Sequence, residues 1–285
     1  MTLRAGFVGL GNMGEGMALN LLRAGFPLTV RDVRPEPLDR LRAAGARVVH
    51  GNFELGRSCD VVCLAVFDAE QVRQVCLASG ADAGLLAGLS PGAAICIHST
   101  VPVSLSRELA ELASPRGIQV LDAPMTGGGE VAAREGKLTF FVGGEGTAFE
   151  RCKPVFEAMT HKLFHVGPLG AGAAAKIMSN FLAISNTITV REALRLARGF
   201  GIPEERLLEI VNQGGVGSSW VSNNWQRIRE QEAHYTTGKA GMVAMASKDM
   251  QLALALAEAT HTAMPVLSFL VETALPDLAA NSLTA

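Results

Sequence analysis

Two patterns of hydrophobic and polar positions divide the chain. Up to about Val166, short apolar, β-branched runs alternate with longer segments whose apolar residues recur at helical spacing. The runs predict these strands: Ala5–Gly9, Leu28–Asp32, Val61–Val66, Ala94–His98, Gln119–Asp122 and Leu138–Gly143. The segments between them predict these helices: Met13–Arg23, Pro35–Ala44, Ala69–Cys76, Val103–Ala113 and Ala148–Met159. Because strands that alternate with helices pair in parallel, we predict an α/β fold with a doubly wound, Rossmann-like sheet.

Beyond Gly167 the pattern is helical throughout. No proline or turn dipeptide lies between Gly172 and Gly199, so this segment predicts one helix on the order of 40 Å long. The helices predicted after it are Pro203–Asn212, Val221–Glu232, Gly241–His261 and Pro265–Ala279. We therefore predict an N-terminal Rossmann domain over residues 1–166 and an all-α domain over residues 167–285, joined by the long interdomain helix.

The composition is that of a globular protein. With 285 residues, of which 48% are hydrophobic, the chain can build two domains with large cores. Its 25 Lys and Arg against 27 Asp and Glu give a net charge of −2, which argues against nucleic-acid and membrane partners. The five cysteines have no paired spacing, and His98, His165 and His261 cluster neither with acids nor with each other, so we expect no disulfide framework and no metal site. Because no signal-peptide pattern is present, we expect a cytoplasmic protein.

The first apolar run leads into a glycine-rich loop, "FVGLGNMG", ahead of the first predicted helix. GxGxxG is a weak signal alone, and the strand before it and the helix after it strengthen the prediction of a dinucleotide-binding loop. Gly9 would permit a tight turn, Gly11 would let a pyrophosphate approach the backbone, and Gly14 would let helix and strand pack closely. Exposed amides at the helix start would hold the phosphates. The cofactor contacts predicted in this loop are Gly9, Leu10, Gly11, Asn12, Met13 and Gly14.

An acidic residue, Asp32, closes the second predicted strand about 20 residues beyond the loop. We expect its carboxylate to accept hydrogen bonds from the adenosine ribose hydroxyls. Its charge would repel the 2′-phosphate of NADP, which favours NAD as the cofactor. Arg31 and Arg34 flank the acid and either could meet a phosphate, so NADP stays open.

Three further motifs follow the glycine loop: "LDAPMTGGGEVAAREGKLTFFVGG", "GAGAAAKIMSN" and "KDM" at Lys248. On these four motifs, in this order, essentially the whole chain resembles the β-hydroxyacid dehydrogenase family, whose members act on 3-hydroxyisobutyrate, tartronate semialdehyde or threonate. The resemblance implies an NAD(P)-dependent oxidoreductase that moves a hydride between the nicotinamide and a small 3-hydroxy acid. It also makes the Rossmann domain the dinucleotide-binding domain and the all-α domain the one for substrate and oligomerisation.

The second motif offers a site for the substrate carboxylate. Thr126, Gly127 and Gly128 combine a hydroxyl with unhindered backbone amides, which can form a concave anion site. A plain glycine-rich turn would have the same composition, and the resemblance is what favours substrate binding here.

The third motif carries Lys176 and Asn180, which are four residues apart and share one helix face. The resemblance implies that Lys176 is catalytic. It would take the hydroxyl proton when the alcohol gives up its hydride, and a desolvated site that lowers a lysine's pKa suits this task and its reverse. Asn180 would hold the substrate hydroxyl or the lysine. The alternative for a lone lysine on an apolar helix is a snorkelling side chain.

The resemblance implies further contacts. Lys248 would lie near nicotinamide and substrate, with Asp249 orienting it, although the residues alone would predict only a surface ion pair. Thr100 matches a cofactor-contacting threonine, and Val66 opens "VFD", where the family usually has Leu-Pro at a cofactor contact. Lys239 stands where the family commonly has an aromatic pocket residue, and would either select a more acidic substrate or point to solvent.

Two other interpretations are open. The chain could be an imine reductase, since these enzymes share the fold but usually lack the lysine, or a non-catalytic dinucleotide-binding module. From the strongly apolar C-terminal helices we also predict self-association as a homodimer or homotetramer.

Overall fold

The polypeptide divides into two units in the computed structural model, Met1–Lys176 and Ile177–Ala285. The structure describes residues 2–77, 80–127, 129–233 and 238–281, without the side chains of Gln231, Ala233 and Lys239. The boundary between Lys176 and Ile177 falls within helix α9 (Ala171–Phe200). The first turn of α9 belongs to the first unit because it lies against the sheet: a Cβ on Gly172 would stand 2.3 Å from the carbonyl oxygen of Phe141.

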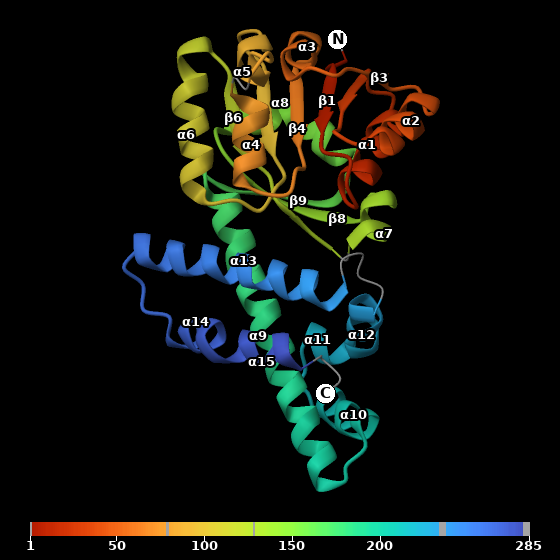
Figure 1. Ribbon diagram of the computed structural model, residues 1–285, viewed down its shortest axis with the longest axis vertical. Coiled ribbons are helices and arrows are strands. Elements are labelled where there is room, and N and C mark those ends of the chain that lie inside the picture. The colour runs from red at the N-terminus through yellow and green to blue at the C-terminus, as the bar shows by residue number, and fades with distance from the viewer. Residues whose placement is uncertain (1, 78–79, 128, 234–237, 282–285) are drawn as a thin grey trace. The chain divides into compact units, whose positions relative to one another are not determined.

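The first unit is built on one mixed sheet (Figure 1). Its strands are β1 (Ala5–Val8), β2 (Leu28–Arg31), β3 (Arg47–Val48), β4 (Val61–Leu64), β5 (Ala94–Ile97), β6 (Gln119–Asp122), β7 (Met125–Thr126), β8 (Leu138–Gly143) and β9 (Thr160–Gly167). They lie in the order β3-β2-β1-β4-β5-β6-β8-β7, with β9 paired to β8. The first six strands of this order are parallel, and β8 runs antiparallel to β6 and β7. The order 3-2-1-4-5-6 is that of the Rossmann fold, which confirms the predicted fold class.

The central strands supply two hydrophobic cores with alternate residues. On β1, Phe7 joins one core and Val8 the other, and Cys63 and Leu64 do the same on β4. Every residue of β1, β4 and β5 is buried. Helices cover both faces of such a parallel sheet, and this is why these strands are continuous apolar runs in the sequence.

Helices connect the strands of the first unit. They are α1 (Gly14–Arg23), α2 (Pro35–Ala43), α3 (Asn52–Ser58), α4 (Ala69–Cys76), α5 (Gly84–Gly88), α6 (Val103–Ala113), the 3-10 helix η1 (Ser114–Arg116), α7 (Gly129–Arg134) and α8 (Gly146–Glu157). The sequence pattern missed α3, α5 and α7, because helices of five to seven residues are too short to show a helical period. It also missed β3 and β7, which have two residues each, and β9, whose mostly exposed residues form no apolar run.

The second unit is helical throughout its described part, as predicted. After α9 come α10 (Glu204–Gly214), α11 (Trp220–Asn223), α12 (Trp225–Ala233), α13 (Gly238–Ala259), α14 (Pro265–Phe269), the π-helical segment η2 (Leu270–Ala274) and α15 (Leu275–Ala280). They enclose one core, which includes Ile188, Trp225, Met250 and Leu267.

Two predicted helices of this unit are interrupted in the structure. The predicted helix Val221–Glu232 breaks at Asn224, whose backbone leaves the helical region between α11 and α12. The predicted helix Pro265–Ala279 widens into η2 ahead of Pro276. Proline has no amide to donate to the preceding turn, and a π-turn is one way in which a helix accommodates the missing hydrogen bond.

Candidate active site

The glycine loop lies between β1 and α1, and its three glycines have different surroundings. Gly9 has a φ of +91°, and a Cβ there would stand 2.5 Å from the carbonyl oxygen of Ala65. A Cβ on Gly14 would stand 1.9 Å from the carbonyl oxygen of Gly9. No heavy atom lies within 4 Å of a Cβ built on Gly11. The first and third glycines are therefore required by the turn and its packing, whereas the second leaves room for a ligand beside the backbone.

The start of α1 suits a phosphate group. Met13 occupies the N-cap position, and no side chain caps the helix. The first amides of a helix have no intrahelical partner, and an uncapped start is a common binding site for anions. The side chain of Leu10 is buried in the core, whereas Asn12 is exposed. These residues fit the pyrophosphate of a dinucleotide.

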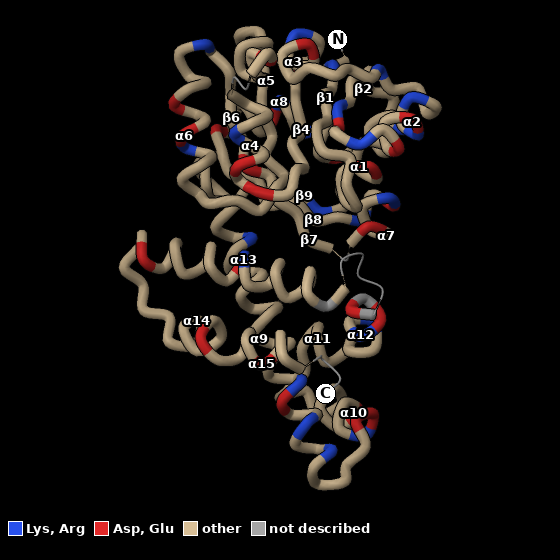
Figure 2. Tube along the Cα trace, in the orientation of Figure 1, with Lys and Arg blue, Asp and Glu red and all other residues tan. Residues whose placement is uncertain are grey.

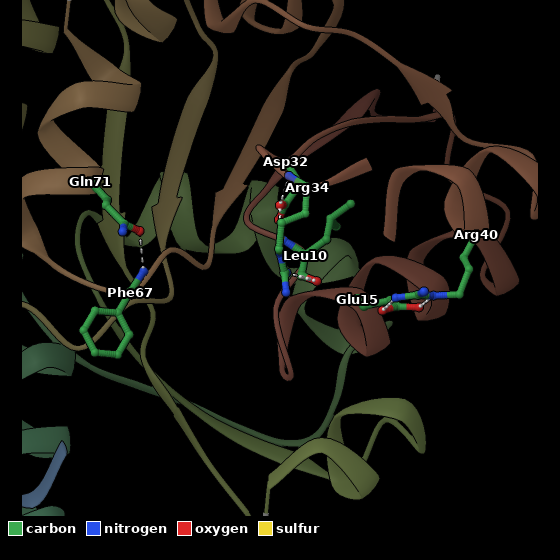
Figure 3. Close-up of polar contacts among 7 residues, drawn as sticks. All are labelled: Leu10, Glu15, Asp32, Arg34, Arg40, Phe67 and Gln71. Carbon is green, nitrogen blue, oxygen red and sulfur yellow. Dashed lines mark hydrogen bonds and ion pairs between the residues drawn. The ribbon is translucent and has the colours of Figure 1, made fainter. Parts of the chain in front are cut away.

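Asp32 follows β2 and is bonded to the glycine loop, as Figure 3 shows. Its Oδ2 accepts a hydrogen bond from the Leu10 amide at 2.5 Å. Its Oδ1 accepts from the amide of Arg34 at 2.8 Å and from the Nε of Arg34 at 3.2 Å, and the same guanidinium donates to the Leu10 carbonyl at 2.9 Å. Burial by itself would raise the pKa of Asp32, but these hydrogen bonds outweigh it and the pKa is lowered. A negatively charged Asp32 carboxylate, with the guanidinium of Arg34 beside it, therefore lies where the ribose of the cofactor is expected.

A second ion pair near the loop was not predicted from the sequence. Glu15, in the first turn of α1, accepts two hydrogen bonds from Arg40 of α2, at 2.6 and 2.7 Å (Figure 3). The hydrogen bonds from Arg40 lower the pKa of Glu15. The pair links α1 to α2, and because its two residues are 25 positions apart in the sequence, no local sequence signal predicts it.

Val66 lies in the turn between β4 and α4, which follows the carboxyl end of its strand as the glycine loop follows that of β1. The Val66 carbonyl accepts a hydrogen bond from the Ser99 hydroxyl at 2.6 Å, which links this turn to the one that carries the half-buried Thr100. Asp68 caps α4, and the Gln71 side chain accepts from the Phe67 amide at 3.0 Å. Phe67 is 68% exposed, and its ring points away from Gln71 in Figure 3. Parallel sheets of this type bind their ligands at the carboxyl ends of their strands.

The predicted carboxylate site is partly described. Thr126 ends β7, where it pairs with Thr139 of β8. Gly127 has a φ of +134°, and a Cβ there would stand 3.1 Å from the carbonyl oxygen of Lys137. Gly128 lies outside the described residues. The described part of the predicted carboxylate site is therefore the half-buried Thr126 followed by an exposed turn, and only glycine fits that turn at position 127.

Lys176 lies in the second turn of α9, which begins at Ala171. The start of this helix is held by Asp122, the last residue of β6, whose carboxylate accepts hydrogen bonds from backbone amides at the helix start. Asp122 is not among the site residues predicted from the sequence. The only local signal is an acid at the end of a strand, and nothing in it indicates that the partner lies about 50 residues away.

Asn180, Lys248 and Asp249 form one cluster in the second unit. The Asn180 Nδ2 donates to Oδ2 of Asp249 at 2.6 Å, and Nζ of Lys248 lies 3.7 Å from Oδ1 of the same carboxylate. Asp249 is only 4% exposed. Its carboxylate therefore binds the amide of Asn180 and lies within ion-pair distance of Lys248, and whether it orients Lys248 for catalysis stays a prediction. The side chain of Lys239 lies outside the described part of the chain.

Charge is mixed over both units, since Figure 2 shows Lys and Arg interspersed with Asp and Glu along the trace. Among the residues that the structure describes, no three His, Cys, Asp or Glu side chains come together as a metal site. No described helix is both long and apolar enough to cross a membrane. Self-association and a cytoplasmic location stay predictions from the sequence.

Two family profiles together cover nearly the whole chain. Residues 4–167 match the NAD-binding domain of 6-phosphogluconate dehydrogenase, and residues 170–283 match the NAD-binding region of NADP-dependent 3-hydroxyisobutyrate dehydrogenase. The chain belongs to the β-hydroxyacid dehydrogenase family. As a member it is an NAD(P)-dependent oxidoreductase of hydroxy acids, and the resemblance drawn from the four motifs is confirmed.

Individual members of the family are similar along most of their length. An NAD-dependent L-serine dehydrogenase of Pseudomonas aeruginosa is 36% identical over 264 residues, which is 91% of this chain and 87% of that protein. A 3-hydroxyisobutyrate dehydrogenase of the same organism is 36% identical over 265 residues, with the same coverage. The solved structure of Mycobacterium tuberculosis 3-hydroxyisobutyrate dehydrogenase with L-serine has a TM-score of 0.82 at 29% identity, and the match covers 99% of this chain and 95% of that one.

Proposed function

We propose that the protein oxidises a short 3-hydroxy acid with NAD, and that Lys176 is the general acid/base. The observation that carries the proposal is the pair Lys176 and Asn180, four residues apart on α9, in a chain whose glycine loop and Asp32 fit a dinucleotide. The similar enzymes of P. aeruginosa are named for L-serine and 3-hydroxyisobutyrate, and both of these compounds are 3-hydroxy acids.

Each proposed role follows from the chemistry of the residue. The nicotinamide, when bound, supplies the hydride acceptor. The neutral amine of Lys176 takes the hydroxyl proton as the carbinol C–H bond breaks, and the ammonium returns it in the reverse direction. Asn180, oriented by Asp249, holds the hydroxyl oxygen in reach of the lysine. Thr126 and the amide of Gly127 bind the substrate carboxylate, which sets the distance from the acid group to the carbinol carbon.

We propose NAD rather than NADP as the preferred cofactor. The anionic Asp32 accepts from the loop amide on one oxygen and retains further lone pairs for the ribose hydroxyls. A 2′-phosphate would meet this negative charge. Arg34 lies against the same carboxylate, so it neutralises part of that repulsion.

The test is NADH formation from a panel of 3-hydroxy acids by the wild type and by Lys176→Met. A positioned general base contributes about 10²–10⁴-fold, so the variant should lose about that factor in kcat while it still folds and binds NADH. Lys153→Met on the surface of α8 is the matched control and should keep the wild-type kcat. A folded Lys176→Met enzyme with wild-type kcat would remove Lys176 from the mechanism. Turnover of cyclic imines but not of hydroxy acids would identify an imine reductase, and no turnover of either would indicate a binding module.

A further inference from the structure

Asp122 is a buried acid that joins two segments of the first unit. It ends β6, is 1% exposed, and stands four residues before Thr126. Its Oδ1 accepts a hydrogen bond from the amide of Gly170 at 2.6 Å, and its Oδ2 accepts from the amide of Ala173 at 2.5 Å. These amides lie at the start of α9, so the helix is capped by a strand residue and not by a neighbour in sequence.

The surroundings of Asp122 leave the start of α9 little freedom to shift. A Cβ on Gly143 would stand 2.6 Å from Oδ1 of Asp122, and a Cβ on Gly172 would stand 2.8 Å from the Asp122 carbonyl oxygen. Both glycines therefore allow backbone to lie directly against the acid. The carboxylate and these contacts fix the first turn of α9 on the sheet, and Ala173 is one turn before Lys176.

Asp122 is costly for the stability of the fold. Burial raises its pKa, although the amides that donate to it act in the opposite direction. An acid whose pKa is raised by folding contributes most to stability at low pH, and this contribution is lost as the pH rises through that pKa. Asp82 provides a contrast: it accepts from the amides of Asn52 and Phe53 at the start of α3, at 2.6 and 3.0 Å, and these bonds outweigh burial and lower its pKa. An acid can thus bind the amides at a helix start without being buried as deeply as Asp122. The need for a helix cap alone therefore does not explain why Asp122 is buried.

We infer that Asp122 is a positioning residue, which sets the distance between Lys176 on α9 and the carboxylate-binding residues Thr126 and Gly127. The inference rests on the proposed function. Asp122 leads directly into the segment that ends in Thr126, and its two oxygens hold the turn that precedes Lys176. A displacement of about 1 Å between reacting groups can cost about 10²-fold in rate. One rigid side chain between the two segments would prevent that displacement.

The experiment uses Asp122→Asn in the full-length protein. The variant keeps the size of the side chain, but its NH₂ group cannot accept one of the two amide hydrogens. We expect kcat to fall by about 10- to 100-fold and KM for the hydroxy acid to rise, while the Kd for NADH stays within about twofold because the glycine loop is not touched. Asp82→Asn, the matched cap without a catalytic neighbour, should lower the melting temperature and leave kcat unchanged.

A double-mutant cycle shows whether the effect passes through the lysine. In the Lys176→Met background, Asp122→Asn should lower the residual rate no further. An equal loss in both backgrounds, or a folded Asp122→Asn enzyme with wild-type kcat, overturns the inference. Gly172→Ala moves the same turn with the carboxylate intact and should give the same pattern. If neither variant folds, Asp122 serves the fold alone and the inference is wrong. Wild-type kcat in Lys176→Met is a separate outcome, because it contradicts the proposed function itself.

Discussion

Replacing Asp32 by Asn should change which dinucleotide the protein prefers. The substitution keeps the size of the side chain and removes its charge. In the structure the carboxylate already accepts from the Leu10 amide at 2.5 Å and the Arg34 amide at 2.8 Å, and a carboxylate has about four lone-pair sites, so it can also accept from ribose hydroxyls. A hydrogen bond to a charged group contributes about 1.5–3 kcal/mol.

The expected effects on the two cofactors have opposite signs. Losing one charged hydrogen bond to the ribose should weaken NADH binding by about 10- to 150-fold, at about 1.4 kcal/mol per factor of ten. A phosphate about 4 Å from a carboxylate is repelled by about 4 kcal/mol at an effective dielectric constant of about 20, and the Asn variant removes this repulsion. Arg34, whose Nε lies 3.2 Å from Asp32, is then released to pair with the phosphate. The ratio of the NADPH to the NADH dissociation constant should therefore fall by at least about 100-fold.

The assay is titration of cofactor fluorescence, with NADH and with NADPH, in the wild type, Asp32→Asn and Asp39→Asn. Asp39 lies on the surface of α2 in an ion pair with Arg42, so its variant controls for the loss of one acid. A ratio in Asp32→Asn that stays within about twofold of the wild type would refute the reasoning. So would a wild-type protein that binds NADPH at least as tightly as NADH.

Two further predictions concern the glycine loop and the second unit. Gly11→Ala should keep the wild-type melting temperature because its Cβ meets no protein atom, and should weaken NADH binding because the Cβ would occupy the space left for the ligand. Gly14→Ala should lower the melting temperature because its Cβ would stand 1.9 Å from a carbonyl oxygen, and equal melting temperatures of the two variants would contradict this packing. Asp277→Asn removes the carboxylate that lies 2.5 Å from the buried guanidinium of Arg191, and should lower the free energy of unfolding by about 1 kcal/mol, because Asp277 is 38% exposed and solvent screens the pair. The hydrogen bond from Arg191 lowers the pKa of Asp277, so the pair stabilises the fold above the ordinary pKa of Asp and loses its effect as the pH falls. Denaturant unfolding of the wild type and of Asp277→Asn should therefore show a difference in unfolding free energy that is smaller in acid than near neutral pH. A difference that does not change with pH would contradict the pairing.

The sequence by itself determined the features that depend on local chain properties. The buried strands were visible because a parallel sheet covered on both faces needs continuous apolar runs, and α9 was visible because about thirty residues without a breaker repeat the helical period. The glycines of the loop stand at fixed offsets because a tight turn and a close helix start require them there. Elements of two to seven residues, and the exposed strand β9, lack such a period and were missed.

Only the tertiary structure decided which distant side chains meet. Asp122 reaches amides 48 and 51 residues away, and Asn180 reaches Asp249 across 69 residues. Such contacts follow from the way in which helices pack on a sheet or on each other, and packing leaves no periodic trace along the chain. The sequence could therefore name Lys176 and Asn180 from their spacing on one helix. The contacts of Asp122 with the start of α9, and of Asp249 with Asn180, depend on elements far away in the chain and became visible only in the folded protein.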